Sequence, residues 1–192
     1  HHRRVVGHLA HPRRPHARVV VATSPARADG DHDMTHRVLV TGAAGYLGSN
    51  LVKSLADRAA SGGDPTCIVA SDVRDVPAER RLAGVEYVAL DVRAPGLAEV
   101  LAEHRIDTVV HLAAIVTPGP QSNRELEYSV DVLGTRNVLD ACVARGVRRI
   151  IVTSSGAAYG YHADNPEWLT EDHAVRGNEA FAYSHHKRLV EE

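Results

Sequence analysis

Residues 36–48 read HRVLVTGAAGYLG, a short apolar run that leads directly into three glycines spaced three residues apart. The run 36–41 is rich in β-branched residues, as a strand buried on both faces should be. Residues 47–60 then carry apolar side chains at helical spacing, which predicts an amphipathic helix. A glycine turn between such a strand and such a helix is an arrangement that binds the phosphates of a dinucleotide.

Each glycine has its own task in that arrangement. Gly42 permits the tight turn, Gly45 lets the backbone approach a pyrophosphate, and Gly48 lets the helix pack close to the sheet. Tyr46 and Leu47 lie at the start of the helix, where free N–H groups and a partial positive charge favour an anion. Glycines also serve ordinary turns, but the strand before and the helix after favour a cofactor site here.

The rest of the chain alternates between strand-like and helix-like segments joined by short loops. Further strands are predicted over 66–71, 85–90, 108–112 and 149–153, and further helices over 97–104, 123–145 and 180–192. Gly146 stands where a glycine ends a helix. Such alternation implies right-handed crossovers and a parallel sheet covered on both faces. The sequence therefore predicts an α/β, Rossmann-like doubly wound parallel sheet with five strands.

An acidic side chain follows the second predicted strand. Asp72 stands where a carboxylate accepts hydrogen bonds from the adenosine ribose of NAD and repels the additional phosphate of NADP. Arg74, two residues on, would weaken that exclusion. A solvated loop aspartate is the alternative interpretation. NAD is the predicted cofactor, and NADP is the less favoured one.

A Tyr-x-x-x-Lys pair lies near the end of the chain. Tyr183 and Lys187 are four residues apart on a predicted helix, so they share one face. A free tyrosine has a pKa of about 10, and a nearby ammonium and a positive nicotinamide ring are both expected to lower the pKa of Tyr183. Tyr183 is thus predicted to be a general base that takes a proton from a substrate hydroxyl while hydride leaves the same carbon. Pairs with this spacing also occur by chance on helix surfaces, but the position after the fifth strand favours catalysis.

Ser155 is the predicted third member of the catalytic group. It directly follows the fifth strand, and its hydroxyl is expected to hold the reacting oxygen against Tyr183. A serine that only caps or turns the chain is the alternative. Ser154 has a weaker claim, and Tyr159 is expected to pack near the site. Lys187 is also predicted to hold the ribose hydroxyls of the cofactor.

The glycine spacing, with Thr41 before it, resembles the short-chain dehydrogenase/reductase superfamily. More narrowly, the chain is similar to the extended, NAD-dependent epimerase/dehydratase branch, which includes nucleotide-sugar 4-epimerases and 4,6-dehydratases. Other matching pieces are 91–92 (DV), 111–114 (HLAA), 134–139 (GTRNVL) and 154–160 (SSGAAYG). The resemblance covers residues 36–192.

The resemblance implies further cofactor contacts. It places Asp91 and Val92 beside the adenine, and Leu112, Ala113 and Ala114 along the dinucleotide cleft. Taken by itself, Asp91 is explained equally well as a helix N-cap. The alanines are explained equally well as core residues.

One position departs from the family's pattern. Where many members carry Asn three residues before the helical Gly-Thr, this chain has Asp131. By resemblance, that Asn stabilises the site near the catalytic lysine. Asp keeps the acceptor, loses the donor and is expected to add a negative charge near Lys187. This affects the predicted proton relay and leaves the cofactor and the catalytic group unchanged.

Composition restricts the class of protein. The chain has 192 residues, 44% of them hydrophobic and 24% charged, with a net charge of −2. These values predict one soluble domain without the basic surface that nucleic acids need. No apolar run approaches the length that spans a bilayer. Cys67 and Cys142 are expected to be free thiols in a reducing cytosol, which predicts a cytoplasmic protein.

Residues 1–33 differ in kind from the rest of the chain. They are rich in arginine and histidine, show little periodicity and precede Met34. A targeting peptide and a metal-binding histidine tract are possible interpretations. A disordered or non-native leader, translated from upstream of a start at Met34, is favoured. The incomplete NAD-binding domain is accordingly predicted to span residues 34–192.

The histidines of the C-terminal part do not predict a metal site. His162, His173 and Asp164 lack a spacing that places two ligands on one helical face, so the loop histidines are expected to be solvated. His185 and His186 lie between Tyr183 and Lys187 in sequence but are expected on other faces of the helix.

Together these patterns predict an NAD-dependent oxidoreductase or epimerase acting on a secondary alcohol, with a nucleotide sugar as the favoured substrate. The polar loop 161–178, which carries Trp168, is placed to meet that substrate. A dehydrogenase or reductase of a small hydroxy compound and a non-catalytic NAD sensor are the alternatives. The intact Tyr183 and Lys187 favour an enzyme. By resemblance, a C-terminal substrate region and the last strands are missing, and the full-length protein is expected to form homodimers.

Overall fold

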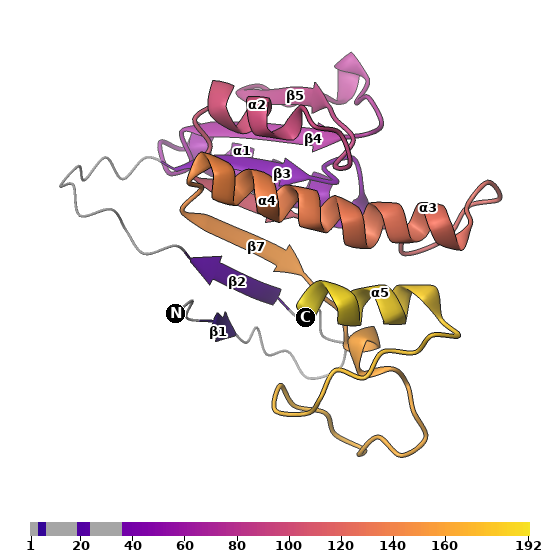
Figure 1. The fold of residues 1–192 in the computed structure, drawn as a ribbon. Helices are drawn as coiled ribbons and strands as arrows, with labels where there is room; N and C mark the ends of the chain where they lie inside the picture. The colour runs from indigo at the N-terminus through magenta and orange to yellow at the C-terminus, as the bar shows by residue number, and fades with distance from the viewer. Residues whose placement is uncertain (1–3, 7–18, 24–35) are drawn as a thin grey trace.

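The computed structural model describes residues 4–6, 19–23 and 36–192. Five parallel strands form the centre of its sheet (Figure 1). They are β3 (Arg37–Thr41), β4 (Cys67–Asp72), β5 (Val85–Ala89), β6 (Thr108–His111) and β7 (Arg149–Thr153). Their spatial order is β7-β6-β3-β4-β5, so the chain crosses from one side of β3 to the other between β5 and β6. The predicted five-stranded, Rossmann-like parallel sheet is confirmed.

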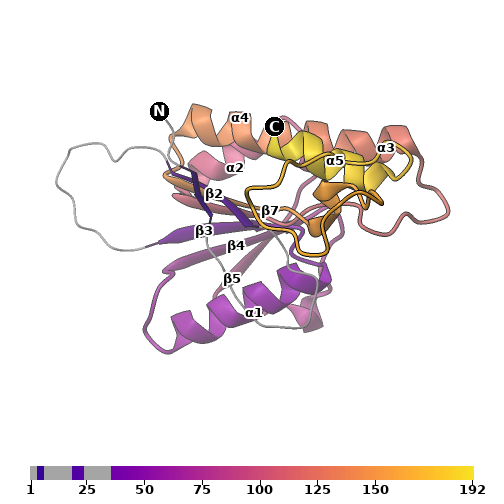
Figure 2. The same cartoon turned by 90° about the horizontal axis from the view of Figure 1, so that it is seen from below.

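Helices cover both faces of this sheet (Figure 2). One face carries α1 (Tyr46–Ala60), and the other carries α2 (Leu97–Glu103), α3 (Arg124–Tyr128), α4 (Thr135–Arg145) and α5 (Ala182–Glu191). Among the described residues, no helix is both long and apolar enough to cross a membrane.

Alternation along β3 divides the core between the two faces. Val38 and Val40 pack with Val52 of α1, whereas Leu39 packs on the opposite face with Val138 of α4. Successive side chains of a strand point to opposite faces, so an apolar run fills both layers. Each fully buried side chain of this size contributes roughly 1.5–3 kcal/mol. The apolar run quoted first therefore anchors both helical layers.

The segment predicted as one helix over 123–145 is continuous but has a widened turn. Asn123 caps its start, with Oδ1 accepting from the Leu126 N–H at 2.8 Å. A π-helical stretch, Ser129–Gly134, joins α3 to α4. Gly146 ends α4 in the left-handed region at φ 67°, as predicted. The widened turn was not predicted, because helical periodicity in sequence does not distinguish it from an α-helical turn.

Two short strands lie within the segment interpreted as a leader. β1 (Arg4–Val6) pairs with β2 (Val19–Thr23), and β2 pairs antiparallel with β7, beside which it lies in Figure 1. They extend the sheet to seven strands and were not predicted. The interpretation of residues 1–33 as a leader stays a prediction, since 1–3, 7–18 and 24–33 lie outside the described residues.

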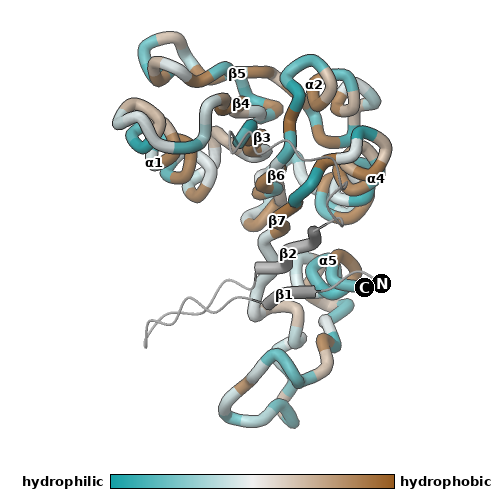
Figure 3. Tube along the Cα trace, turned by 90° about the vertical axis from the view of Figure 1, so that its left-hand side faces the viewer, coloured by the Kyte–Doolittle hydropathy of each residue, from teal (hydrophilic) through white to brown (hydrophobic). Residues whose placement is uncertain are grey.

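A long loop separates the end of β7 from α5. It follows a short 3₁₀ helix, Gly156–Tyr159, and projects away from the sheet, with many hydrophilic residues along its trace (Figure 3). Helix α5 begins at Ala182, after an extended Phe181 without a side-chain cap. The predicted start at residue 180 was therefore two residues early.

Candidate active site

The glycine turn packs against backbone atoms on its inner side, at Gly42 and Gly48, and is open on its outer side, at Gly45. Gly42 has φ +69°, and a Cβ there would lie 2.7 Å from the Ala113 backbone nitrogen. A Cβ at Gly48 would overlap the Gly42 carbonyl oxygen. At Gly45 the nearest atom to a Cβ would be that same oxygen, at 3.1 Å, so the outer side is free for an incoming group.

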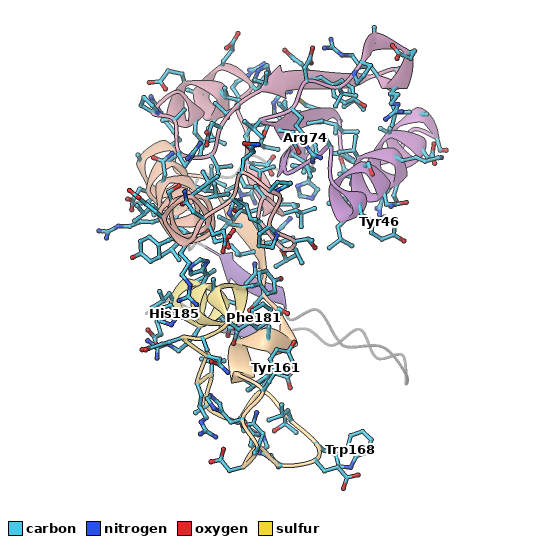
Figure 4. All side chains as sticks on the ribbon, turned by 90° about the vertical axis from the view of Figure 1, so that its right-hand side faces the viewer. Tyr46, Arg74, Tyr161, Trp168, Phe181 and His185 are labelled. Atoms are coloured by element: carbon cyan, nitrogen blue, oxygen red, sulfur yellow. The ribbon has the colours of Figure 1, made fainter. Side chains whose placement is uncertain are left out.

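The start of α1 suits an anion. The first turn contains no acidic residue, and Tyr46 and Leu47 are exposed there, with Tyr46 labelled in Figure 4. Free N–H groups at a helix start attract a pyrophosphate. The turn therefore fits the phosphates of a dinucleotide, and the roles of these residues stay predictions.

Asp72 lies at the carboxyl end of β4 with its carboxylate already bonded. Oδ2 accepts from the Ala44 N–H at 3.0 Å, and Oδ1 accepts from the N–H of Arg74 at 3.0 Å and from its Nε at 3.1 Å. Burial alone would raise the pKa of Asp72, but the hydrogen bonds from Arg74 and Ala44 outweigh it and hold the pKa below its ordinary value.

A shallow surface depression beside Asp72 and Arg74, too small to enclose a water molecule, is also lined by Ala43 and Tyr87. It lies at the carboxyl ends of the strands, where ligands bind in open α/β sheets. The guanidinium of Arg74 already hydrogen-bonds the Asp72 carboxylate, which was predicted to hold the ribose. Arg74 must therefore share or release Asp72 when a ribose binds there.

The remaining predicted cofactor residues lie around the ends of β5 and β6. Asp91 accepts from the Arg93 N–H at 2.9 Å, and its pKa is lowered mainly by the side-chain hydrogen bond from Arg93. It is not a helix N-cap, because Gly96 holds that position before α2. Val92 is buried in the core.

The residues after β6 are held by Thr41. The backbone N–H groups of Leu112 and Ala113 donate to Thr41 Oγ1 at 3.2 and 3.4 Å. Ala113 also packs against the core, while Ala114 is partly exposed. The structure thus places these residues beside the glycine turn, and their contact with a cofactor stays a prediction.

A buried hydrogen-bond chain that was not predicted ties this turn to α4. His111 Nδ1 lies 2.7 Å from Thr41 Oγ1, and its Nε2 lies 3.0 Å from Thr135 Oγ1. Thr135 donates its own proton to the Asp131 carbonyl at 2.6 Å, so it must accept from Nε2–H. His111 is therefore the neutral Nε2–H tautomer. Burial, aided by the charge of Lys187, lowers the pKa of His111 to about 3.

The predicted catalytic residues converge where β7 ends. Ser155 caps the 3₁₀ turn by accepting from the Ala157 N–H at 3.2 Å, and its hydroxyl is near enough to the Tyr183 phenol to lower the pKa of Tyr183. Both interpretations of Ser155 are thus compatible. From α5, Lys187 donates to the Thr153 carbonyl at 2.8 Å and lies 5.5 Å from the centre of the Tyr183 ring.

The expected lowering of the tyrosine pKa is wrong for the chain alone. Burial raises the pKa of Tyr183, and the negative charge of Asp131 and the Tyr161 phenol raise it further, against the hydrogen bond from Ser155. Burial likewise lowers the pKa of Lys187, opposed by Asp131 and Glu191. Asp131 therefore adds negative charge near Lys187, as expected. A stabilised phenolate requires another positive charge near Tyr183.

The loop 161–178 is fastened at its base. The N–H of Gly177 donates to the Ala158 carbonyl at 2.8 Å, and His162 Nε2 lies 2.7 Å from the Gly177 carbonyl. His173 Nδ1 accepts from the Thr170 N–H at 3.0 Å. Both histidines keep partial solvent exposure, as expected, and are in addition hydrogen-bonded within the loop.

The aromatic side chains of this region separate into two groups. Tyr161 and Phe181 have ring centres 6.2 Å apart, and Phe181 and Tyr183 are separated by the same distance. Trp168 is 79% exposed at the far end of the loop, away from Tyr161 and Phe181 (Figure 4). Tyr161 and Phe181 therefore lie near Tyr183, whereas Trp168 does not. Within the described residues, no group of three or more potential metal ligands occurs.

A Rossmann-like sheet with an open glycine turn between its first parallel strand and helix is typical of a dinucleotide-binding domain. Comparison with protein families agrees with this class. Residues 38–192 match the NAD dependent epimerase/dehydratase family. The chain belongs to that family, and the predicted membership is confirmed.

Individual proteins show the same similarity. The N-acetyl-alpha-D-glucosaminyl-diphospho-ditrans,octacis-undecaprenol 4-epimerase of Escherichia coli O157:H7 is 36% identical over 70% of this chain and 37% of its own length. A short-chain dehydrogenase/reductase superfamily protein from Agrobacterium tumefaciens with bound NAD is 33% identical, with a TM-score of 0.63 over 81% of this chain and 43% of that one.

The Bordetella bronchiseptica enzyme WbmG in complex with NAD and UDP is 26% identical, with a TM-score of 0.66 over 82% of this chain and 47% of that one. The chain therefore spans between a third and a half of the length of these relatives.

Proposed function

We propose that this chain is the cofactor-binding and catalytic part of an NAD-dependent oxidoreductase or epimerase that acts on a secondary alcohol. The convergence of Ser155, Tyr183 and Lys187 beside the end of β7 carries this proposal. A nucleotide sugar is the favoured substrate class. WbmG was solved with NAD and UDP, which supports this class, and the E. coli relative is named as a 4-epimerase of a glucosaminyl diphosphate linked to undecaprenol.

Two features of the chain support NAD as the cofactor. The outer side of Gly45 is open, and the buried carboxylate of Asp72 lies beside a shallow depression at the strand ends. Gly42, Gly45 and Gly48 with the start of α1 would hold the pyrophosphate. When bound, NAD supplies the acceptor for hydride and, in its oxidised form, a positive charge near the reacting carbon.

Residues of the chain itself would transfer the proton. The raised pKa of Tyr183 keeps the phenol protonated at neutral pH in the free chain, so that it is ready to give a proton to a ketone. As a base it needs nearby positive charge, to which Lys187 contributes once the site is assembled. Ser155 would hold the substrate oxygen by a hydrogen bond, and Lys187 would hold ribose hydroxyls.

The test follows the absorbance of reduced cofactor with a panel of nucleotide sugars and simple secondary alcohols. Tyr183→Phe should lower turnover by about 10²–10⁴-fold, the usual contribution of a positioned acid or base. Tyr159→Phe is the matched control, since it keeps an aromatic ring close by and should retain turnover. Equal turnover in wild type and Tyr183→Phe would exclude the proposed base. NAD binding without turnover of any substrate would favour the sensor.

A further inference from the structure

The strongest unassigned feature is a buried pair between the widened turn and α5. His186 and Asp131 have side chains that are 5% and 2% exposed, and His186 Nδ1 lies 3.0 Å from Asp131 Oδ2. The other carboxylate oxygen, Oδ1, accepts from the Ile115 N–H at 2.8 Å. Because a carboxylate only accepts, Nδ1 of His186 must be the donor. Both oxygens of a buried carboxylate are thereby satisfied.

His186 directly precedes Lys187, the residue proposed to hold the cofactor, in α5. Asp131 acts electrostatically on Lys187. Among the described residues, however, the ion-pair contact of Asp131 is with His186, whereas Lys187 donates to the Thr153 carbonyl. The Lys187 ammonium thus feels the charge of the Asp131 carboxylate without forming an ion pair with it. A direct pair would hold Lys187 strongly, because attraction between charges rises steeply in a poorly hydrated interior.

The widened turn explains why the carboxylate reaches this place. Asp131 lies within the π-helical stretch Ser129–Gly134, a type of turn that is rare and frequent at functional sites. The stretch packs closely on the core, since a Cβ at Gly134 would lie 2.8 Å from a Val92 methyl group. On the other side of the pair, the Tyr128 ring meets the His186 ring edge-on at 5.7 Å. Asp131 and His186 are therefore both fixed by packing.

We propose that His186 is a positioning residue that engages Asp131 and so leaves Lys187 available for the cofactor ribose. Removing the imidazole would leave the buried Asp131 carboxylate with only its bond from the Ile115 N–H. Lys187, the next residue along α5, is a cation on which Asp131 already acts and which could neutralise its charge. Lys187 would then turn from the Thr153 carbonyl and from the cofactor toward Asp131. This inference rests on the proposed cofactor role of Lys187, but it is measured by NAD affinity and not by turnover.

The test is a double-mutant cycle on the dissociation constant of NAD, measured by titration calorimetry with the whole chain. His186→Leu should raise the dissociation constant about tenfold, within the range of coupling seen between contacting residues. In a Lys187→Met background the same substitution should change it by less than about twofold, because its effect acts through Lys187. Additive effects, or no effect of Lys187→Met on affinity, would overturn the proposal.

Charge removal at Asp131 provides a readout that a purely structural role would not give. Adding Asp131→Asn to His186→Leu should restore NAD affinity to within about threefold of wild type, since the carboxylate that captures Lys187 is gone. His186→Asn, which keeps a donor near the Nδ1 position, should also bind NAD almost normally. If the double variant binds no better than His186→Leu, the proposal is wrong.

The neighbouring histidine is the matched control. His185 lies on the same helix, where Figure 4 labels it, and His185→Leu should change NAD affinity by less than about twofold. An equal loss in both leucine variants would show a general effect on α5 and contradict the proposal. If His186→Leu does not fold by circular dichroism, His186→Ser replaces it with the same expected tenfold loss. Failure of turnover in a wild type that binds NAD would overturn the proposed function and leave this result standing.

Discussion

At the glycine turn the groups that face the cofactor region are backbone atoms, whereas at the end of β7 they are side chains with altered pKa values. A Cβ at Gly42 or Gly48 would meet backbone. Around Tyr183 and Lys187, burial opposes charge on both groups. The glycine turn depends on the absence of side chains. The region at the end of β7 depends on the charges around Tyr183 and Lys187. Substitutions in the two regions should therefore fail in different ways.

The largest expected effect is at the backbone-defined region. Gly48→Ala places a methyl group against the Gly42 carbonyl and the Ala43 Cα, neither of which can move without shifting the turn. We expect a loss of about 1–3 kcal/mol or more in unfolding free energy, together with loss of NAD binding. Chemical denaturation and NAD titration would measure both. Gly96→Ala, where a Cβ meets nothing within 4 Å, should leave both nearly unchanged, and a similar loss there would contradict this explanation.

The chain from Thr41 through His111 to Thr135 connects the two regions, and breaking it should be the next largest effect. His111→Leu leaves the Thr41 hydroxyl proton without its acceptor and takes one donor from Thr135, which keeps its bond to the Asp131 carbonyl. An unsatisfied buried group costs about 1–3 kcal/mol, so we expect a loss in that range in denaturation experiments. His36→Leu changes a histidine that is 32% exposed and serves as the control. A loss below about 1 kcal/mol at His111 would show that the chain is not a structural link.

The same histidine should make stability depend on pH. The pKa of His111 is about 3 in the folded chain, against an ordinary value of 6.5. Between these values the unfolded state binds the additional proton, so this contribution is complete above pH 6.5 and is lost as pH falls toward 3. The slope approaches about 1.4 kcal/mol per pH unit. Urea denaturation from pH 7 to 4 should show a shallower slope in His111→Gln than in wild type; equal slopes would contradict the assignment.

The smallest expected effect separates the two aromatic groups of the loop region. Tyr161 borders Phe181 and influences the pKa of Tyr183, so Tyr161→Ala should lower kcat/KM by about tenfold, as loss of a positioned contact does. Trp168, exposed at the far end of the loop, should tolerate alanine with less than a twofold change. The reverse order in steady-state assays would move the substrate contact to the tip of the loop.

Local sequence was sufficient to predict those elements of the fold that depend on residues close together in the chain. The β-branched run 36–41, the glycines behind it and the helical spacing of 47–60 predict a strand, a turn and a helix. Gly146 likewise marked the end of α4. The convergence of Ser155 and Tyr183 followed from the rule that ligand sites lie at the carboxyl ends of parallel strands.

The features that sequence did not predict depend on residues far apart in the chain. His186 meets Asp131 across 55 positions, and His111 meets Thr41 across 70. Burial, which the residue type alone does not reveal, determines the lowered pKa of His111. The same reason explains the wrong expectation for Tyr183, whose burial was invisible in the sequence. Trp168 is a large aromatic residue in the loop, but the tertiary structure leaves its side chain exposed to solvent.

The most direct test of the account measures binding and chemistry on one variant. Tyr183→Phe removes the phenol oxygen from the side-chain region and leaves the glycine turn and Asp72 untouched. We predict that it binds NAD within about threefold of wild type by calorimetry, while turnover of the best substrate falls by about 10²–10⁴-fold. Retained turnover, or a loss of NAD affinity as large as the loss of turnover, would contradict the division between a backbone site for the cofactor and a side-chain site for the chemistry.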